Sequence, residues 1–210
     1  MSCQSILSKQ PKADLDGLGV NDEERMSVDI RRLEFEDLPD ELRIALEPRV
    51  KRLGYLGEFF KVAGHQPDAL IAFMEFTDAA KGRLPKRVVE TIALTVAVAT
   101  GNTYERNQHE RLSVRLGFGR DWVAAVEQLK PSADRIGQEE AAVQAFVTAA
   151  LASNGRGVDT LLKDVCQVLG PAEAVAVLMV MGRYVTHSLM VNSLGLAPPV
   201  PSIFEDGFAG

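Results

Sequence analysis

The segment from Val88 to Ala99 constrains the fold of this chain more than any other stretch. It reads VVETIALTVAVA and has helical spacing, with apolar residues on nearly every face. A helix of this kind must be covered on all sides by other parts of the structure. The run AVAVLMVMG, from Ala174 to Gly182, has a similar character. Two such helices in a chain of 210 residues predict that one or both pack against another subunit, and therefore a homo-oligomer.

Signals for helix starts and stops organise the rest of the chain. Pro39, Pro67 and Pro85 each precede apolar residues at helical spacing, as is typical of proline in a first helical turn. No segment shows the two-residue alternation of a strand bounded by hairpin signals. The predicted fold class is therefore all-α, a single-domain bundle of about eight helices. After the helix that begins at Pro85, helices are expected at 103–116, 119–129, 137–152, 158–169 and 171–194.

The ends of the chain differ from its middle. Residues 1–28 are polar and lack periodic apolar positions, which predicts a flexible N-terminal tail. We expect the helical domain over 29–201 and a C-terminal tail at 202–210. The chain is long enough to bury a core without disulfide or metal staples. No secretory signal or uninterrupted membrane-spanning segment is visible, so a cytoplasmic protein is expected.

Charge and cysteine content argue against several kinds of partner and site. The formal net charge is -6 and no basic stripe is present, so neither nucleic acid nor an anionic membrane is an expected partner. The two cysteines, Cys3 and Cys166, lie far apart in the sequence. We expect two reduced thiols, because two distant cysteines make no metal site and a bridge would have to hold the tail.

Glu90 is the lone charge within the first apolar helix, and the next acid along the chain is Glu105. Burying a carboxylate costs several kcal/mol unless it is paired or hydrogen-bonded; otherwise its pKa rises until it is neutral. One interpretation is a salt bridge to a cation at the start of the helix, namely Arg83, Lys86 or Arg87. The other is that the carboxylate has a chemical use.

The next helix places an amide, a carboxylate and an imidazole on one face. Asn102, Glu105 and His109 are separated by three and four residues, so their side chains stack along that face. Glu105 can accept a hydrogen bond from one imidazole nitrogen, which fixes the tautomer and raises the basicity of the other nitrogen. This arrangement can act as a general acid or base. The same spacing also occurs on plain helix surfaces.

Two other histidines are weaker candidates. His65 follows Gly64 and is expected in a solvated loop. His187 lies three residues after Tyr184 and faces the same side of the last helix. We expect a satisfied core histidine there, although the residue could also approach the main site or an oligomer interface.

Several of these residues together resemble a known family. The run from Leu84 to Glu90, the apolar helix, Tyr104-Glu105-xxx-His109 and Gly117 resemble the core of the carboxymuconolactone decarboxylase and alkyl hydroperoxidase D-like superfamily. The resemblance extends more loosely from about residue 31 to residue 201. It implies an alkyl hydroperoxidase D-like helical fold.

The hydroperoxidase members of that superfamily open this second helix with a Cys-x-x-Cys pair. Aligned on His109, the two cysteine positions fall on Asn102 and Glu105, and neither is cysteine. Attack of a thiolate on a peroxide and formation of a disulfide both need sulfur at those positions. Cys166 is on a distant helix and is no evident substitute. The resemblance is therefore to the decarboxylase-like branch, which carries a glutamate at the second position.

The resemblance implies a lyase that works by acid/base chemistry on a small carboxylated or lactone substrate, without a metal or an organic cofactor. His109 would donate or accept the proton, Glu105 would orient it, and Glu90 would be the second carboxylate. The groups that would bind the substrate are the possible hydrogen-bond donors Asn102 and Tyr104, and the cations Arg106 and Arg115.

Two other functions stay open. A non-catalytic, oligomeric member could bind a ligand or a protein, and its Glu–His face would then be a polar network that holds helices in register. A sealed and fully paired cluster of Glu90 and His109 would favour that function, whereas a pocket open to solvent would favour an enzyme. A peroxidase-related antioxidant protein is less favoured, because the cysteine pair is missing.

Overall fold

In the computed structural model, residues 30–205 and 208 are described, and they contain ten α-helices, one short 3-10 helix (Phe35–Asp37) and no strand. The predicted all-α class is confirmed, and the expected N-terminal tail lies outside the described residues. In chain order the α-helices are α1 (Asp40–Leu53), α2 (Glu58–Ala63), α3 (Pro67–Lys81), α4 (Lys86–Ala99), α5 (Thr103–Arg115), α6 (Arg120–Glu127), α7 (Ala133–Ile136), α8 (Gln138–Ser153), α9 (Asp159–Leu169) and α10 (Pro171–Ser193).

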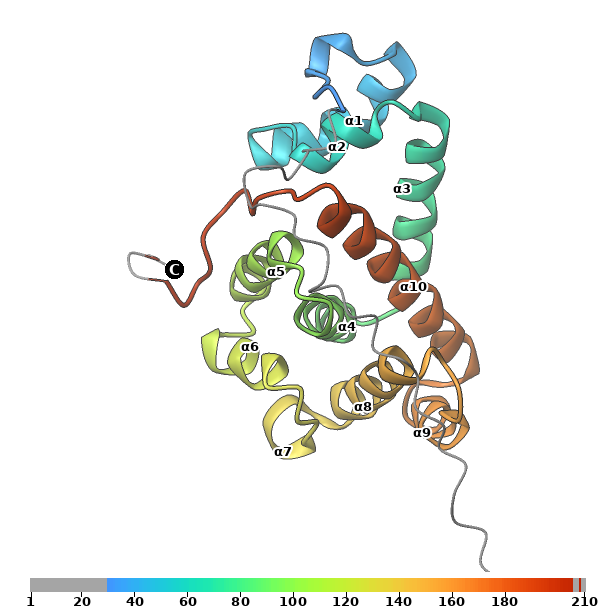
Figure 1. Cartoon of the computed structure of the whole chain (residues 1–210). Helices are drawn as coiled ribbons and strands as arrows, with labels where there is room; N and C mark the ends of the chain where they lie inside the picture. Colours follow the sequence, from blue (N-terminus) through green and yellow to red (C-terminus); the bar gives the residue numbers. More distant parts are fainter. Residues whose placement is uncertain (1–29, 206–207, 209–210) are drawn as a thin grey trace, which may run out of the picture.

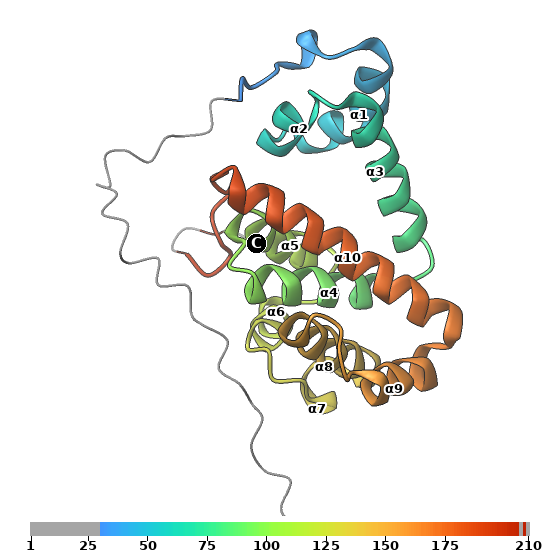
Figure 2. The ribbon, with the colours of Figure 1, turned by 45° about the vertical axis from the view of Figure 1, so that its right-hand side comes forward.

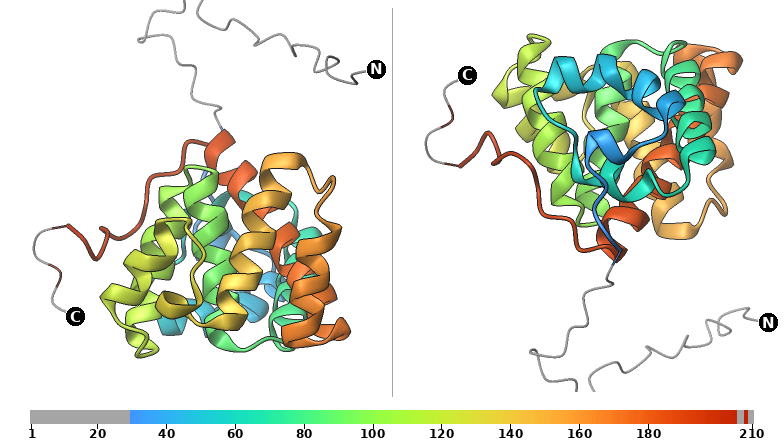
Figure 3. Two further views of the ribbon diagram at one scale, coloured as in Figure 1. Left: turned by 90° about the horizontal axis from the view of Figure 1, so that it is seen from below. Right: turned by 90° about the horizontal axis from the view of Figure 1, so that it is seen from above.

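Helix α4 lies at the centre of the bundle, packed against α5, α8 and α10 (Figures 1 and 2). Every residue from Val88 to Ala97 is buried. The apolar character of this segment is thus explained by neighbours within one chain, as its sequence demanded. Helices α1 and α2 lie over one end of the bundle, which is seen from above in Figure 3.

A tight turn joins α4 to α5 and makes them neighbours. Gly101 adopts a positive φ of 65°, a conformation that glycine takes at little cost. Asn102 then caps α5, with its side-chain oxygen accepting a hydrogen bond from the backbone N–H of Glu105 at 3.1 Å. Because the two helices run back along each other, the first turns of α4 face the middle of α5.

Most expected helices are present within one or two residues, and Pro67 opens α3 as its first residue. The short helices α2 and α7 were not predicted. They have six and four residues, too few for a helical repeat of apolar positions to show. The first residues of the expected C-terminal tail pack against the domain: Ile203 is fully buried, and Ser202 donates a hydrogen bond to Glu110 at 2.6 Å.

Helix α10 has two apolar faces. Its inner face, which includes Val177, Val180 and Tyr184, belongs to the main core together with α4 and α8. Its outer face is exposed, with Val175 51% and Leu189 63% accessible. The helix is long and apolar enough to cross a bilayer by length and composition alone, and its inner face is buried in the main core.

Candidate functional site

The hairpin of α4 and α5 brings the predicted acid/base residues together. His109 Nδ1 lies 2.7 Å from Glu90 Oε2, and His109 Nε2 lies 3.2 Å from Glu105 Oε2. The imidazole therefore has a carboxylate at each nitrogen. Glu90, Glu105 and His109 are only 4%, 6% and 8% exposed, so these contacts are made away from bulk water.

Helix α10 adds two more groups to Glu105. Arg183 Nη1 donates a hydrogen bond to Glu105 Oε2 at 3.3 Å, and His187 Nδ1 lies 3.1 Å from Glu105 Oε1 without hydrogen-bond geometry. We refer to Glu90, Glu105, His109, Arg183 and His187 as the His–carboxylate cluster. It joins α4, α5 and α10, three helices that meet in the middle of the fold (Figure 1).

The two carboxylates determine the charge of His109. Burial alone lowers the pKa of His109, but the negative charges and hydrogen bonds of Glu90 and Glu105 outweigh burial and raise it to about 9. The geometry agrees, because each imidazole nitrogen lies within 3.2 Å of a carboxylate oxygen, and two neighbouring negative charges favour the imidazolium ion. His109 therefore carries a positive charge at neutral pH.

Glu105 and His187 respond to burial in opposite ways. Burial would raise the pKa of Glu105, but the neighbouring His187, Arg183 and His109 hold it well below its usual range. Burial lowers the pKa of His187 to about 4, although Glu105 opposes this shift. His187 is thus neutral at pH 7, and its ring packs 4.1 Å from the ring of Phe59 between centroids. Arg183 and His109 are the cations that keep Glu105 ionised at that pH.

Lys81 and Tyr184 lie at the edge of the cluster. The Tyr184 ring contacts His109 edge to face, with ring centroids 5.2 Å apart. Lys81 Nζ and Arg183 Cζ approach the same Tyr184 ring, at 4.9 Å and 4.5 Å from its centroid. Burial and the nearby Arg183 charge lower the pKa of Lys81 to about 8, against the opposing effect of Glu105 and Glu90.

Residues 67–155 match the sequence model of the carboxymuconolactone decarboxylase family. This match, over less than half of the chain, supports the resemblance to the carboxymuconolactone decarboxylase and alkyl hydroperoxidase D-like superfamily. The matched segment runs from α3 to the end of α8 and contains Glu90, Glu105 and His109. No curated protein matches the sequence.

Two solved structures share the fold of this chain. A variant of the debrominase Bmp8 in complex with 2,3,4-tribromopyrrole is 19% identical, with 81% of this chain and 91% of that chain covered and a TM-score of 0.70. An alkylhydroperoxidase AhpD core, an uncharacterized peroxidase-related protein from Ralstonia eutropha JMP134, is 20% identical, with 80% and 90% covered and a TM-score of 0.70. At these identities the likeness shows the fold alone.

At the positions where hydroperoxidase members of the superfamily carry cysteines, this chain carries a helix cap and a clustered carboxylate. Asn102 is 1% exposed, caps α5 and donates a hydrogen bond to Ser188 Oγ at 3.0 Å. Tyr104 is also buried, and its hydroxyl accepts a hydrogen bond from the Phe59 backbone N–H at 3.3 Å. Both predicted substrate-binding groups are therefore engaged in holding helices together.

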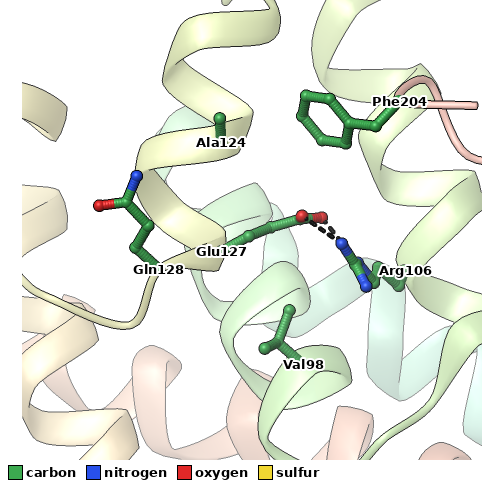
Figure 4. Close-up of a pocket in the computed structure, with 6 residues that line it drawn as sticks. All are labelled: Val98, Arg106, Ala124, Glu127, Gln128 and Phe204. Atoms are coloured by element: carbon green, nitrogen blue, oxygen red, sulfur yellow. Dashed lines mark hydrogen bonds and ion pairs between the residues drawn. The ribbon is translucent and has the colours of Figure 1, made fainter.

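Arg106 and Arg115, the two candidates for holding a substrate carboxylate, lie outside the His–carboxylate cluster. Arg106 donates two hydrogen bonds to Glu127, at 3.0 and 2.6 Å, and lies 3.1 Å from Glu110. It lines an open pocket of about 360 Å³ with Glu127 and Phe204 (Figure 4). Arg115 is exposed at the last residue of α5.

The partner of Glu90 is His109 rather than a cation at the start of α4, because Arg87 pairs with Glu140 at 2.7 Å instead. Sequence reasoning missed Lys81 and Arg183. A signal for Arg183 was present, since it is the single charged residue between Glu173 and Glu205. The lone charge in an apolar helix identified Glu90, and the same criterion applied to α10 would have identified Arg183.

Proposed function

We propose that this protein is a cofactor-free acid/base enzyme, of lyase type, that acts on a small carboxylated or lactone substrate. The observation that carries the proposal is the position of His109 between two buried carboxylates, with Arg183 on the second of them. Buried titratable groups with shifted pKa values that face one another are typical of catalytic sites. A protonated histidine in this setting can give its proton to a carbon or oxygen on which negative charge develops.

In this proposal the two nitrogens of His109 have different roles. The 2.7 Å contact with Glu90 holds Nδ1 and orients the ring, so Glu90 is a positioning residue. The longer 3.2 Å contact leaves Nε2 as the nitrogen that exchanges its proton with substrate. When a carboxylate leaves as carbon dioxide, its electron pair stays on the substrate; the Nε2 proton forms the new C–H bond, and neutral His109 regains a proton from solvent. Since Glu90 and Glu105 raise the pKa of His109 to about 9, it starts as the acid at neutral pH.

The second candidate is a non-catalytic member that binds a ligand or a protein, and the low exposure of Glu90 and His109 favours it. A cluster with complete pairing would have no need of a substrate. Here Tyr184 has a buried hydroxyl without a hydrogen-bond partner among the described residues. Unmet hydrogen-bonding capacity beside His109 supports the enzyme over the purely structural network.

The test is a panel of small lactone acids and unsaturated or β-keto acids, assayed for release of carbon dioxide and for change in ultraviolet absorbance. We expect turnover by the wild type and a loss of about a hundredfold or more in His109→Gln. His65→Gln is the matched control, because His65 is exposed and its ring nitrogen Nε2 lies 2.9 Å from the Arg31 carbonyl, away from the cluster. Turnover that survives His109→Gln contradicts the proposal; binding without turnover supports the second candidate.

We also propose that the protein is a cytoplasmic homo-oligomer without nucleic-acid or membrane partners. The outer face of α10 supports self-association, because Val175, Gly182 and Leu189 follow one another at seven-residue intervals with Leu178 and Met179 beside them. Positions seven apart lie on one side of a helix, so this face is a continuous apolar stripe. In a two-fold pairing of identical helices, the stripe of one copy can pack on the same stripe of the other.

A further inference from the structure

We infer that Lys81 and Arg183 form an anion-binding subsite beside His109, and that the subsite takes the carboxylate of a small organic acid. The inference rests on the proposed function and names the groups that hold the substrate. Lys81 is the last residue of α3 and Arg183 lies in the middle of α10. The two cationic groups nevertheless converge on one aromatic ring, that of Tyr184.

The charges around this ring do not balance within the protein. His109, Arg183 and Lys81 are positive groups, and among the described residues the carboxylates in contact with His109 and Arg183 are Glu90 and Glu105. Both carboxylates are already in contact with His109 or Arg183, whereas Lys81 has no ion-pair partner among the described residues. Lys81 is partly buried. An unpaired charge that is partly removed from water is unfavourable, and an anion from solution relieves that cost.

One further acid lies near Lys81 and is otherwise engaged. Asp78, one helical turn before Lys81, pairs with Arg49 at 2.7 Å. It therefore neutralises a cation on α1 rather than the Lys81 ammonium group. The surplus positive charge stays at the junction of α3 and α10.

The free hydrogen-bonding edge of Arg183 fits a carboxylate. Its Nε donates to Thr77 Oγ1 at 3.3 Å and its Nη1 to Glu105, whereas its Nη2 makes no hydrogen bond to the described residues. A carboxylate can place one oxygen on Nη2 and the other on the Lys81 ammonium group. The rings of Phe73 and Tyr184 lie under the guanidinium, at 5.4 and 4.5 Å, and offer an apolar wall to the body of an organic acid. Such walls favour an organic carboxylate over inorganic phosphate.

Binding of a carboxylate would change the pKa and the reactivity of the Lys81 amine. In the free protein, burial and the Arg183 charge lower the pKa of the Lys81 amine to about 8, so a substantial fraction is neutral and nucleophilic at mildly alkaline pH. An anion against the ammonium group favours the charged form and raises that pKa. Each unit of increase reduces the neutral fraction by up to about tenfold. Binding therefore protects Lys81 from acylation without any turnover.

The experiment measures acetylation of individual lysines by limiting acetic anhydride at about pH 8, with peptide mass spectrometry as the readout. Benzoate is the probe, and phosphate and sodium chloride at the same ionic strength are the comparison anions. We expect benzoate to slow acetylation of Lys81 by about threefold to tenfold and to leave exposed Lys86 and Lys163 unchanged. Protection of Lys81 by phosphate as strong as by benzoate overturns the assignment to a carboxylate.

Variants supply a second readout, the rise in melting temperature on addition of benzoate. This rise is expected to vanish in Lys81→Met and to persist in the control Lys86→Met. It is expected to shrink in Arg183→Lys, because lysine keeps the charge but lacks the planar guanidinium group. No protection and no thermal shift in the wild type overturn the subsite. Because neither readout needs turnover, that failure is distinct from failure of the proposed function, which the His109→Gln assay decides.

Discussion

Replacement of His109 by glutamine tests the electrostatics of the site through protein stability. Glu90 and Glu105 outweigh burial and raise the pKa of His109 to about 9, against 6.5 for an unperturbed histidine. The folded state therefore binds the proton more tightly than the unfolded state. The resulting stabilisation is fully present below about pH 6.5 and is lost as the pH rises through about 9.

The size of the effect follows from that difference. A shift of one pKa unit corresponds to about 1.4 kcal/mol, so the full contribution of the His109 proton is about 3 kcal/mol. Between about pH 6 and about pH 8 the linkage relation gives a loss of about 2 kcal/mol. Other groups titrate nearby: burial lowers the pKa of His187 to about 4, and burial together with Arg183 lowers that of Lys81 to about 8. Both of these shifts make stability rise with pH, which opposes the His109 effect.

The assay is therefore a difference between two proteins. Urea unfolding of wild type and His109→Gln at about pH 6, 7 and 8 gives the free energy of unfolding of each. Contributions of His187 and Lys81 largely cancel in the subtraction. We expect the stability advantage of the wild type to fall by about 2 kcal/mol across this range. An advantage that is constant with pH would refute the doubly paired imidazolium, and His65→Gln should show the wild-type profile.

Three further predictions concern other residues. Glu90→Gln should reduce turnover of any accepted substrate by about a hundredfold. It should also move the alkaline limb of the pH–rate profile to lower pH, because His109 loses the carboxylate that most raises its pKa. Leu189→Glu should dissociate the proposed oligomer, as measured by size-exclusion chromatography with light scattering. The control Lys163→Glu, at an exposed position of α9, should leave the oligomer intact. An oligomer that survives Leu189→Glu excludes the α10 stripe as its interface. Arg106→Met should lower the free energy of unfolding by about 2 kcal/mol, because it leaves buried Glu110 without its cation, and Arg115→Met should change it by less than about 0.5 kcal/mol. Equal losses in the two arginine variants, measured by urea unfolding, would contradict the structural role given to Arg106.

The order of the helices could be predicted from the sequence because proline and glycine residues mark the helix ends locally. Pro67 and Pro85 precede α3 and α4, and glycines separate α4 from α5 and α9 from α10. The short helices α2 and α7 could not be read in the same way. Their boundaries depend on packing between longer helices, and a segment of one turn carries no repeat that distinguishes it from a loop.

The candidate site was only half accessible to sequence reasoning. Glu105 and His109 lie four residues apart on one helix, and Glu90 was conspicuous as a lone charge, so these three could be found. Which face of α5 meets α4 is a tertiary property. His109 lies on the face of α5 that meets α4, whereas Arg106 points towards Glu127. Spacing along the chain could not show which of these two residues would face α4. The approach of Lys81 to Tyr184 joins residues from α3 and α10 that no local pattern connects.

The same hairpin can support different chemistry according to the residue at position 105. With a thiol there, His109 polarised by Glu90 would withdraw the thiol proton and prepare a nucleophile. With Glu105 there, the imidazole gains a second anion and keeps its proton, because Glu90 and Glu105 together outweigh burial and raise its pKa to about 9. In the proposed reaction, the group that would be a base beside a thiol is therefore an acid. Arg183 makes this possible, since its charge keeps Glu105 ionised in a buried position where a lone carboxylate would take up the proton itself.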